Sequence, residues 1–126
     1  MERAQPITMH LEEGEALDVT PGVYLSVIRE LPWLGESKAG REKVVFPVRL
    51  TEPPFEEVEG EVHSGIRVAA RILGRLGVSV QVQGRAITFD PVECLDKPCR
   101  TKWEAGQRGF VRCTDILPVE EEEIPF

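Results

Sequence analysis

The sequence predicts one mainly β domain, a five-stranded Greek-key barrel with a single α-helix between the third and fourth strands. Three observations predict this class. Several segments that are rich in β-branched residues alternate apolar and polar positions with a period of two. One segment, residues 66–76, has the periodicity of an amphipathic helix. The length of 126 residues, of which 41% are hydrophobic, is sufficient for the core of one domain.

The first half of the chain contains two clear strand patterns and a weaker third. Residues 23–31 follow a Thr-Pro-Gly turn and are predicted to form the first strand. Residues 32–42, which contain two glycines and several charges, are expected to form a loop. Residues 43–50 alternate clearly and predict the second strand, where Pro47 indicates an edge position or a bulge. Residues 55–62 are the candidate third strand, although four of them are glutamates.

The second half of the chain begins with the predicted helix over residues 66–76. Ser64 is its expected N-cap, and Gly77 is its expected C-cap. The remaining expected elements are a hairpin over residues 78–89, a short helical turn from Asp90, and strands over residues 99–104 and 108–117.

Charge is distributed unevenly along the chain. The net charge is -7 and the isoelectric point is near 4.9, which at face value argues against a nucleic-acid partner. Residues 1–20 hold five acids and one base, and residues 119–126 hold four glutamates and no base. Residues 62–118 instead hold nine bases and five acids. This segregation indicates an interaction with a partner. Because no long apolar stretch is present, we expect neither a signal peptide nor a spanning helix, and a cytoplasmic location.

Catalytic and metal-binding patterns are weak. His10 and His63 are the only histidines, and the sequence contains no nucleophile elbow and no phosphate-binding loop. We therefore expect a protein that is not an enzyme and needs no cofactor. The three cysteines form no C-x-x-C pair, and without a secretion signal they are expected to be reduced. A metal-binding module built on Cys94, Cys99 and Cys113 is left as an alternative.

Basic and aromatic residues alternate on the last two predicted strands. Period-two alternation places Arg100 and Lys102 on one face of the first of them, and Arg108, Phe110 and Arg112 on one face of the second. Cations follow phosphates and flat rings stack on unpaired bases, so this pattern predicts binding of single-stranded nucleic acid. Either Phe110 or Trp103 is expected to be a core residue. Four residues of the first loop and second strand would extend the surface if the barrel order holds: Trp33, Arg41, Lys43 and Arg49.

The chain ends in an acidic run followed by Ile-Pro-Phe. Its residues are Glu120, Glu121, Glu122, Glu123, Ile124, Pro125 and Phe126. This ending resembles the acidic tip of bacterial single-stranded DNA-binding proteins, and a chance match of the last three residues is on the order of one in ten thousand. The tip combines an apolar ring and carboxylate with a proline that lowers the entropy lost on docking. The long linker that usually precedes this tip is missing here, which leaves homo-oligomerisation open.

The resemblance implies a fold, a function and partners. Residues 1–118 would form an oligonucleotide-binding (OB) barrel that coats single-stranded DNA without strong sequence preference during replication or recombination. Residues 119–126 would form the tip that recruits replication, recombination or repair proteins. The arrangement is similar to the compact versions that phages encode, so the cytoplasm of a bacterium or of a phage-infected cell is the expected location. The alternative is a phage-encoded protein-interaction module that inhibits a host enzyme and whose acidic ends mimic nucleic acid.

Overall fold

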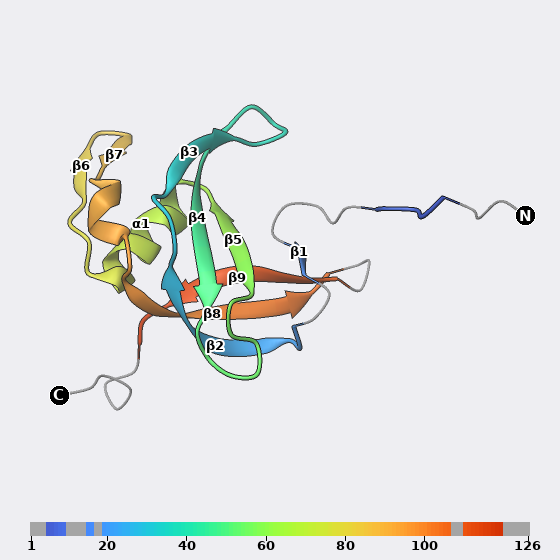
Figure 1. Cartoon of the computed structure of the whole chain (residues 1–126). Helices are drawn as coiled ribbons and strands as arrows, with labels where there is room; N and C mark the ends of the chain where they lie inside the picture. Colours follow the sequence, from blue (N-terminus) through green and yellow to red (C-terminus); the bar gives the residue numbers. More distant parts are fainter. Residues whose placement is uncertain (1–4, 10–14, 17–18, 107–109, 120–126) are drawn as a thin grey trace, which may run out of the picture.

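In the residues that the structure describes, one antiparallel sheet curls around a hydrophobic core and packs against one α-helix (Figure 1). The computed structural model describes residues 5–9, 15–16, 19–106 and 110–119. Its elements in chain order are β1 (Glu15–Ala16), β2 (Gly22–Ile28), β3 (Trp33–Glu36), β4 (Glu42–Leu50), β5 (Glu59–Ser64), α1 (Ile66–Leu76), β6 (Gln81–Gln83), β7 (Ala86–Thr88), the 3-10 helix η1 (Pro91–Cys94), β8 (Pro98–Ala105) and β9 (Val111–Leu117).

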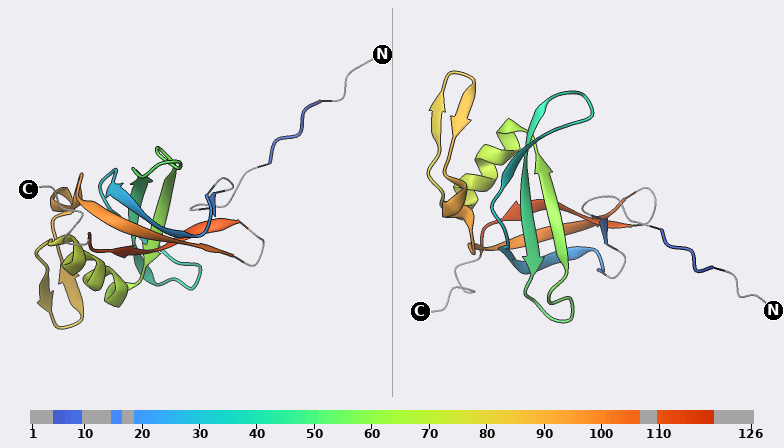
Figure 2. Two further views of the ribbon diagram at one scale, coloured as in Figure 1. Left: turned by 90° about the horizontal axis from the view of Figure 1, so that it is seen from below. Right: turned by 45° about the horizontal axis from the view of Figure 1, so that its top comes forward.

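The sheet forms two layers that share β2. Strand β4 pairs with β3 along its N-terminal half, with β2 along its C-terminal end, and with β5 along its other edge. Strand β2 also pairs with β8, which is followed in the sheet by β9 and β1. Figures 1 and 2 show β4 and β5 crossing over β8 and β9. The core lies between these two layers because inward side chains of both belong to one hydrophobic cluster.

The prediction of a mainly β fold with a helix before the last two strands of the main sheet is confirmed for the described residues. Five strands were predicted, whereas the main sheet of the described residues has seven, and β6 pairs with β7 in a separate ribbon. The expected loop over residues 32–42 contains β3, which is held extended by its pairing with β4. No backbone ladder joins β5 to β9 in the described part of the chain, so the sheet is not a closed barrel.

Pro47 lies within a central strand, contrary to the prediction of an edge or a bulge. Its carbonyl accepts a hydrogen bond of 3.1 Å from the amide of Arg29, which follows β2. A strand residue directs its N–H and its C=O toward the same edge, so the missing N–H of Pro47 would point toward the break between β2 and β3. No ladder hydrogen bond is lost there, and the proline is compatible with a strand that is paired on both sides.

Helix α1 has the predicted bounds, but its first residue is capped differently. Gly65 occupies the N-cap position and no side chain caps the helix. Ser64, the predicted N-cap, is buried and donates a hydrogen bond of 3.2 Å to the carbonyl of Val44. Gly77 ends the helix in the left-handed conformation with φ 77°, as predicted. No helix in the described residues is long and apolar enough to cross a membrane.

A polar side chain of α1 binds the sheet at β9. The guanidinium of Arg75 donates hydrogen bonds to a carboxylate oxygen of Asp115 at 3.1 Å and to the carbonyl of Ile116 at 2.9 Å. Both acceptors belong to β9. Ala69, Ile72 and other apolar side chains on the buried side of α1 pack into the core at the same time. The helix is therefore held by apolar packing and by one charge-assisted contact.

The largest core side chain bridges the two layers. Trp103 of β8 is 1% exposed, and its indole N–H donates a hydrogen bond of 2.8 Å to the hydroxyl of Thr101. That hydroxyl also bonds the hydroxyl of Ser26 at 2.6 Å, and Ser26 donates to the carbonyl of Tyr24. The far end of the indole lies against Gly60 of β5, where a Cβ atom would come within 2.5 Å of Trp103 Cη2. A buried ring with a satisfied N–H thus fills the space between β8 and β5.

Replacing Gly60 by alanine is expected to destabilise the protein by about 1–3 kcal/mol, because the new methyl group collides with the Trp103 ring. Urea denaturation followed by circular dichroism measures the change. Gly74→Ala is the matched control, since a Cβ atom there meets nothing within 4 Å. Because Gly74 lies in α1, alanine at this position should stabilise the protein by about 0.5–1 kcal/mol. Equal stability of Gly60→Ala and the unsubstituted protein would contradict the proposed contact.

Candidate functional site

The structure divides the predicted DNA-binding residues between two opposite faces. Trp33, Lys43 and Arg49 lie on the outward side of β3, β4 and β5, which we call the β4–β5 face. The outward side of β8 and β9, which we call the β8–β9 face, carries Arg100, Lys102 and Arg112. The inward sides of both layers share one core, so the outward side chains point away from each other. The sequence pattern did not reveal this separation because it depends on how the sheet curls.

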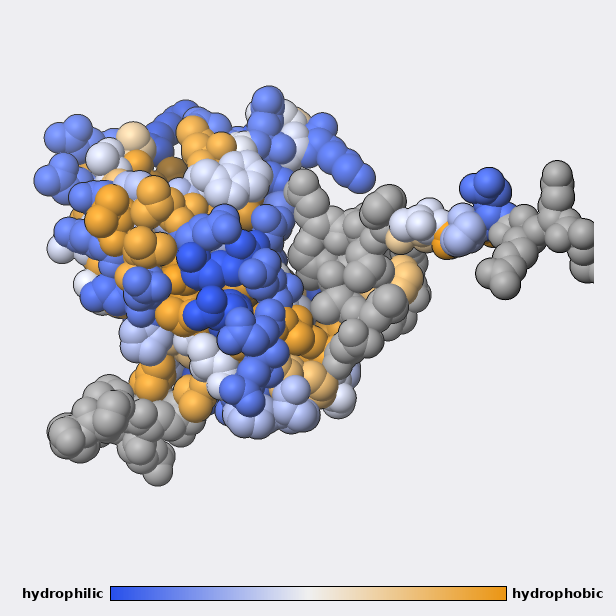
Figure 3. Space-filling view, viewed as in Figure 1, coloured by the Kyte–Doolittle hydropathy of each residue, from blue (hydrophilic) through white to orange (hydrophobic). Residues whose placement is uncertain are grey.

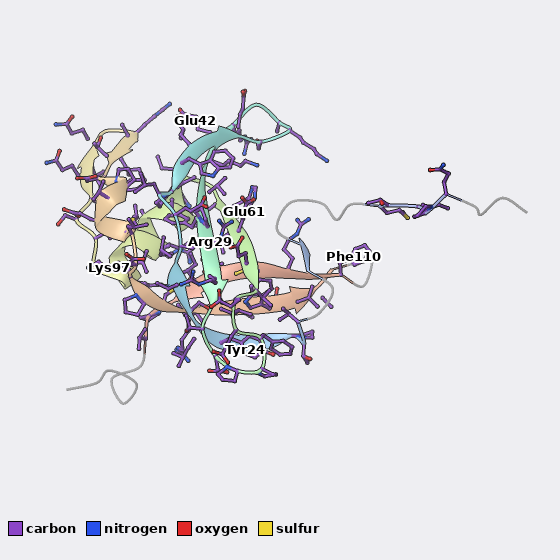
Figure 4. All side chains as sticks on the ribbon, in the orientation of Figure 1. Tyr24, Arg29, Glu42, Glu61, Lys97 and Phe110 are labelled. Atoms are coloured by element: carbon purple, nitrogen blue, oxygen red, sulfur yellow. The ribbon has the colours of Figure 1, made fainter. Side chains whose placement is uncertain are left out.

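The other predicted contacts lie in turns or outside the described residues. Arg41 is exposed in the turn between β3 and β4, and Phe110 is half-buried just before β9. Figure 4 shows Phe110 far from Glu42, which marks the β3–β4 end of the molecule. Two predictions fall outside the described residues. They are Arg108 and the terminal element Glu120, Glu121, Glu122, Glu123, Ile124, Pro125 and Phe126.

Cations on the β8–β9 face are combined with acids and carbonyl oxygens. The ammonium of Lys102 lies 3.0 Å from a carboxylate oxygen of Glu104. A hydrogen bond from Lys102, with its charge, lowers the pKa of the Glu104 carboxyl. Arg100 donates to the carbonyl of Pro118 at 3.0 Å, and Arg112 is paired across the ladder with Glu104. This face therefore presents both signs of charge.

On the β4–β5 face an indole ring lies along the sheet. Trp33 is 45% exposed. A Cβ atom at Gly35 would be 2.8 Å from Cζ3 of this ring and 3.4 Å from Cε of Lys43. The absence of a side chain at Gly35 lets the ring lie over the backbone beside Lys43. One side of the ring thus packs on the strand, and the exposed remainder is available for stacking.

A row of polar side chains continues from Lys43 across β5. The ammonium of Lys43 lies 2.9 Å from Nδ1 of His63, and Nε2 of His63 lies 3.1 Å from a carboxylate oxygen of Glu61. An ammonium has only donors, so Nδ1 accepts and Nε2 carries the proton that Glu61 accepts. The neutral imidazole leaves Lys43 with its full charge. Lys43 is therefore positioned by a neutral partner and is not neutralised by it.

The other end of the β4–β5 face contains two arginines among acids. Arg29 donates to the carbonyl of Val48 at 3.2 Å and pairs with Glu30 at 2.9 Å and with Glu59 at 3.8 Å. Nε of Arg49 is buried without a hydrogen-bond partner in the described residues. Figure 3 shows the hydrophilic side chains gathered over β4 and β5. Their charges are mixed at this end, and the surplus of cations lies toward the β3–β4 turn.

Two hairpins project at that end of the molecule (Figures 1 and 2), and residues of both line a groove. One is β3–β4 and the other is β6–β7. The groove has a volume of about 220 Å³. Its lining residues are Leu34, Glu42, Lys43, Val44, Ile66, Arg85, Ala86, Ile87 and Phe89. Sequence reasoning missed the groove. Leu34 lay in an expected loop, and its neighbours across the groove come from α1 and β7.

The cysteines are buried and separate from this site. Burial raises the pKa of Cys94 to about 11, with the charge of Glu93 as a smaller cause. Burial also raises the pKa of Cys99 to about 12, and it is the largest cause of the raised pKa of Cys113. In the residues that the structure describes, no group of three or more His, Cys, Asp or Glu side chains is placed to hold a metal ion.

Comparison with known proteins gives no further guide to this site: the sequence matches no protein-family model and no curated protein.

The thiols are expected to be unreactive in the folded protein. The thiolate is the reactive form, and raised pKa values keep all three groups protonated at pH 8. Reaction with Ellman's reagent at pH 8 should be at least about tenfold slower in the folded protein than in denaturant, where all three thiols react. A thiol that reacts as fast in the folded protein as in the denatured protein would contradict the burial of the cysteines.

Proposed function

We propose that this protein binds single-stranded DNA on the β4–β5 face of an oligonucleotide-binding fold. In this proposal β2 and β3 are two parts of one first strand that is interrupted at residues 29–32. Strands β4, β5, β8 and β9 are the other four, and α1 lies between the third and the fourth. The pairing of β2 with both β4 and β8 supports this order. OB domains bind oligonucleotides on their second and third strands and on adjoining loops, which correspond here to β4, β5 and the β3–β4 turn.

The exposed ring of Trp33 carries the proposal. It lies over Gly35 beside the charged group of Lys43. Two more cations, Lys38 and Arg41, occupy the adjoining turn, and their side chains make no ion pair with the described residues. A ring that stacks on a base contributes about 1–3 kcal/mol without reading its identity, while neighbouring cations follow the phosphates. This combination supports binding whose affinity depends strongly on salt concentration and only weakly on the base sequence.

The acidic end of the chain supports a second activity, the recruitment of other proteins. Residues 120–126 combine four glutamates with the Ile-Pro-Phe ending described above. In the proposal this tip docks on replication, recombination or repair proteins in the cytoplasm of a bacterium or of a phage-infected cell. Its charge repels the DNA that the folded part binds, so the two activities use separate parts of the chain.

A protein partner is the second candidate. Glu59 and Glu61 lie on the same face as the proposed DNA contacts, beside Arg29 and His63. A face that carries both signs of charge is typical of protein recognition. If the chain binds no oligonucleotide, binding of a protein partner is therefore the function that this face supports.

Titration with oligo-dT at low salt should quench the fluorescence of Trp33. Trp103 is 1% exposed and cannot reach a base, so Trp33→Phe should remove nearly all of the quenching. Trp33→Ala, which removes the ring altogether, should weaken binding by about tenfold, because one stacked base contributes about 1–3 kcal/mol. The logarithm of the affinity should fall with the logarithm of the salt concentration by about 0.7 for each neutralised phosphate. A flat titration with intact protein at low salt would exclude the DNA-binding function.

Deleting residues 119–126 should strengthen the binding of oligo-dT by at least about twofold, because four negative charges that repel the polyanion are removed. Electrophoretic or fluorescence titration of both forms at low salt measures the change. Replacing the four glutamates by glutamine in the full chain is the control, and it should reproduce the effect. Loss of DNA binding on deletion would contradict the assignment of DNA binding to the folded part and of protein recruitment to the tip.

A further inference from the structure

The groove between the β3–β4 hairpin and the β6–β7 ribbon is an apolar hollow with an open mouth. Leu34 on one wall is 66% exposed, and Ile66 on another wall is 49% exposed. Ile87 and Phe89 line the ribbon side and are half-buried. Exposed apolar groups that converge on a hollow mark a binding site more often than isolated ones do.

The volume of the groove selects the size of its occupant. An apolar cavity of about 150 Å³ accepts benzene, whereas sites for drug-sized ligands begin at about 300 Å³. At about 220 Å³, the groove has room for one flat ring system.

The rim of the groove carries several cations. Arg85, at the turn of the β6–β7 ribbon, makes no ion pair or side-chain hydrogen bond with the described residues. Lys43 lines the opposite wall, and Lys38 and Arg41 lie at the tip of the same hairpin. Glu42 is the only acid among the described residues that line the groove. An occupant with an apolar ring and a negative charge outside it fits this arrangement.

The position of β3 connects this groove with Trp33. Strand β3 is at the edge of the sheet, because it pairs only with β4 among the described strands. Successive residues of a strand point to opposite sides, so the side chains of Trp33 and Leu34 lie on the two sides of this edge. A polymer that crosses the edge of β3 therefore meets an indole ring on one side and the apolar groove on the other.

We propose that the groove takes one unstacked base of the bound single-stranded DNA while Arg85 contacts the phosphate of that nucleotide. The neighbouring base in the strand stacks on Trp33. The groove thus anchors the strand where it passes over the edge of β3. This inference rests on the proposed function, and it adds a base-binding site that uses residues from α1 and β7.

Two oligomers of equal length test the base and the phosphate separately. One is oligo-dT, and the other is a fully abasic deoxyribose-phosphate chain. Leu34→Ser should weaken the binding of oligo-dT by about five- to tenfold and leave the binding of the abasic chain unchanged. Arg85→Gln should weaken both by a similar factor and lower the salt slope by about 0.7, the value for one phosphate contact on a single strand.

The matched control is Val92→Ser, which changes a side chain that is 62% exposed and does not line the groove. It should alter neither affinity, and thermal melting of all variants checks that they fold. Equal losses for both oligomers, or no loss, with Leu34→Ser would overturn the base-binding site. The proposed function would still stand in that case if the unsubstituted protein binds oligo-dT with quenching of Trp33. If the unsubstituted protein binds neither oligomer, the proposed function itself fails.

Discussion

The packing of Trp103 against Gly60 holds the two layers of the sheet together where no backbone ladder connects them in the described residues. The ring extends from β8 into the core and ends on the backbone of β5. Its indole N–H is satisfied by Thr101, which also bonds Ser26 of β2. One buried side chain thereby fixes the relative position of three strands. Because interiors are close-packed, even one additional methyl group at this contact changes the separation of the layers.

The orientation of the β4–β5 face follows from this contact and from the break between β2 and β3, which lies opposite Pro47. Strand β4 is paired on both edges. One of these edges is shared by β2 and β3, and the pairing is interrupted at residues 29–32 between them. The separation lets β3 extend past the core with its partner as a hairpin. Trp33 and Leu34 are then displayed on the two sides of an edge strand. The features proposed for binding thus result from how the sheet curls and not from any single sequence motif.

The sequence predicted those elements whose signals are local. Helix α1 and strand β4 repeat apolar residues on one side, and Gly77 and Asp90 occupy the cap positions expected of them. Strand β3 could not be predicted, because its extended form depends on a register with Val44 and Val45. The separation of the predicted cations into two faces was missed for the same reason. Periodicity assigns a residue to one side of its own strand, but it does not show which sides of different strands end on the same surface.

The net charge of -7 does not describe the surface that we propose to bind DNA. On the β8–β9 face Lys102 pairs with Glu104 and Arg100 donates to the carbonyl of Pro118, whereas Lys38, Arg41 and Arg85 lie at the hairpin turns without ion pairs to the described residues. The location of these cations near the exposed ring of Trp33 is more informative than their number. This location also distinguishes the two faces that the strand pattern alone made equivalent.

The most direct test of the central claim is an NMR titration of the 15N-labelled full chain with oligo-dT, followed through the backbone amides and the two indole N–H groups. We expect the largest shifts at the Trp33 indole, in the β3–β4 hairpin and in the turn that contains Arg85. The Trp103 indole and the amides of Arg100, Lys102 and Arg112 should remain nearly unchanged. Shifts concentrated on the β8–β9 face, or none at saturating oligo-dT, would contradict the claim that the strand is bound at the β3 edge.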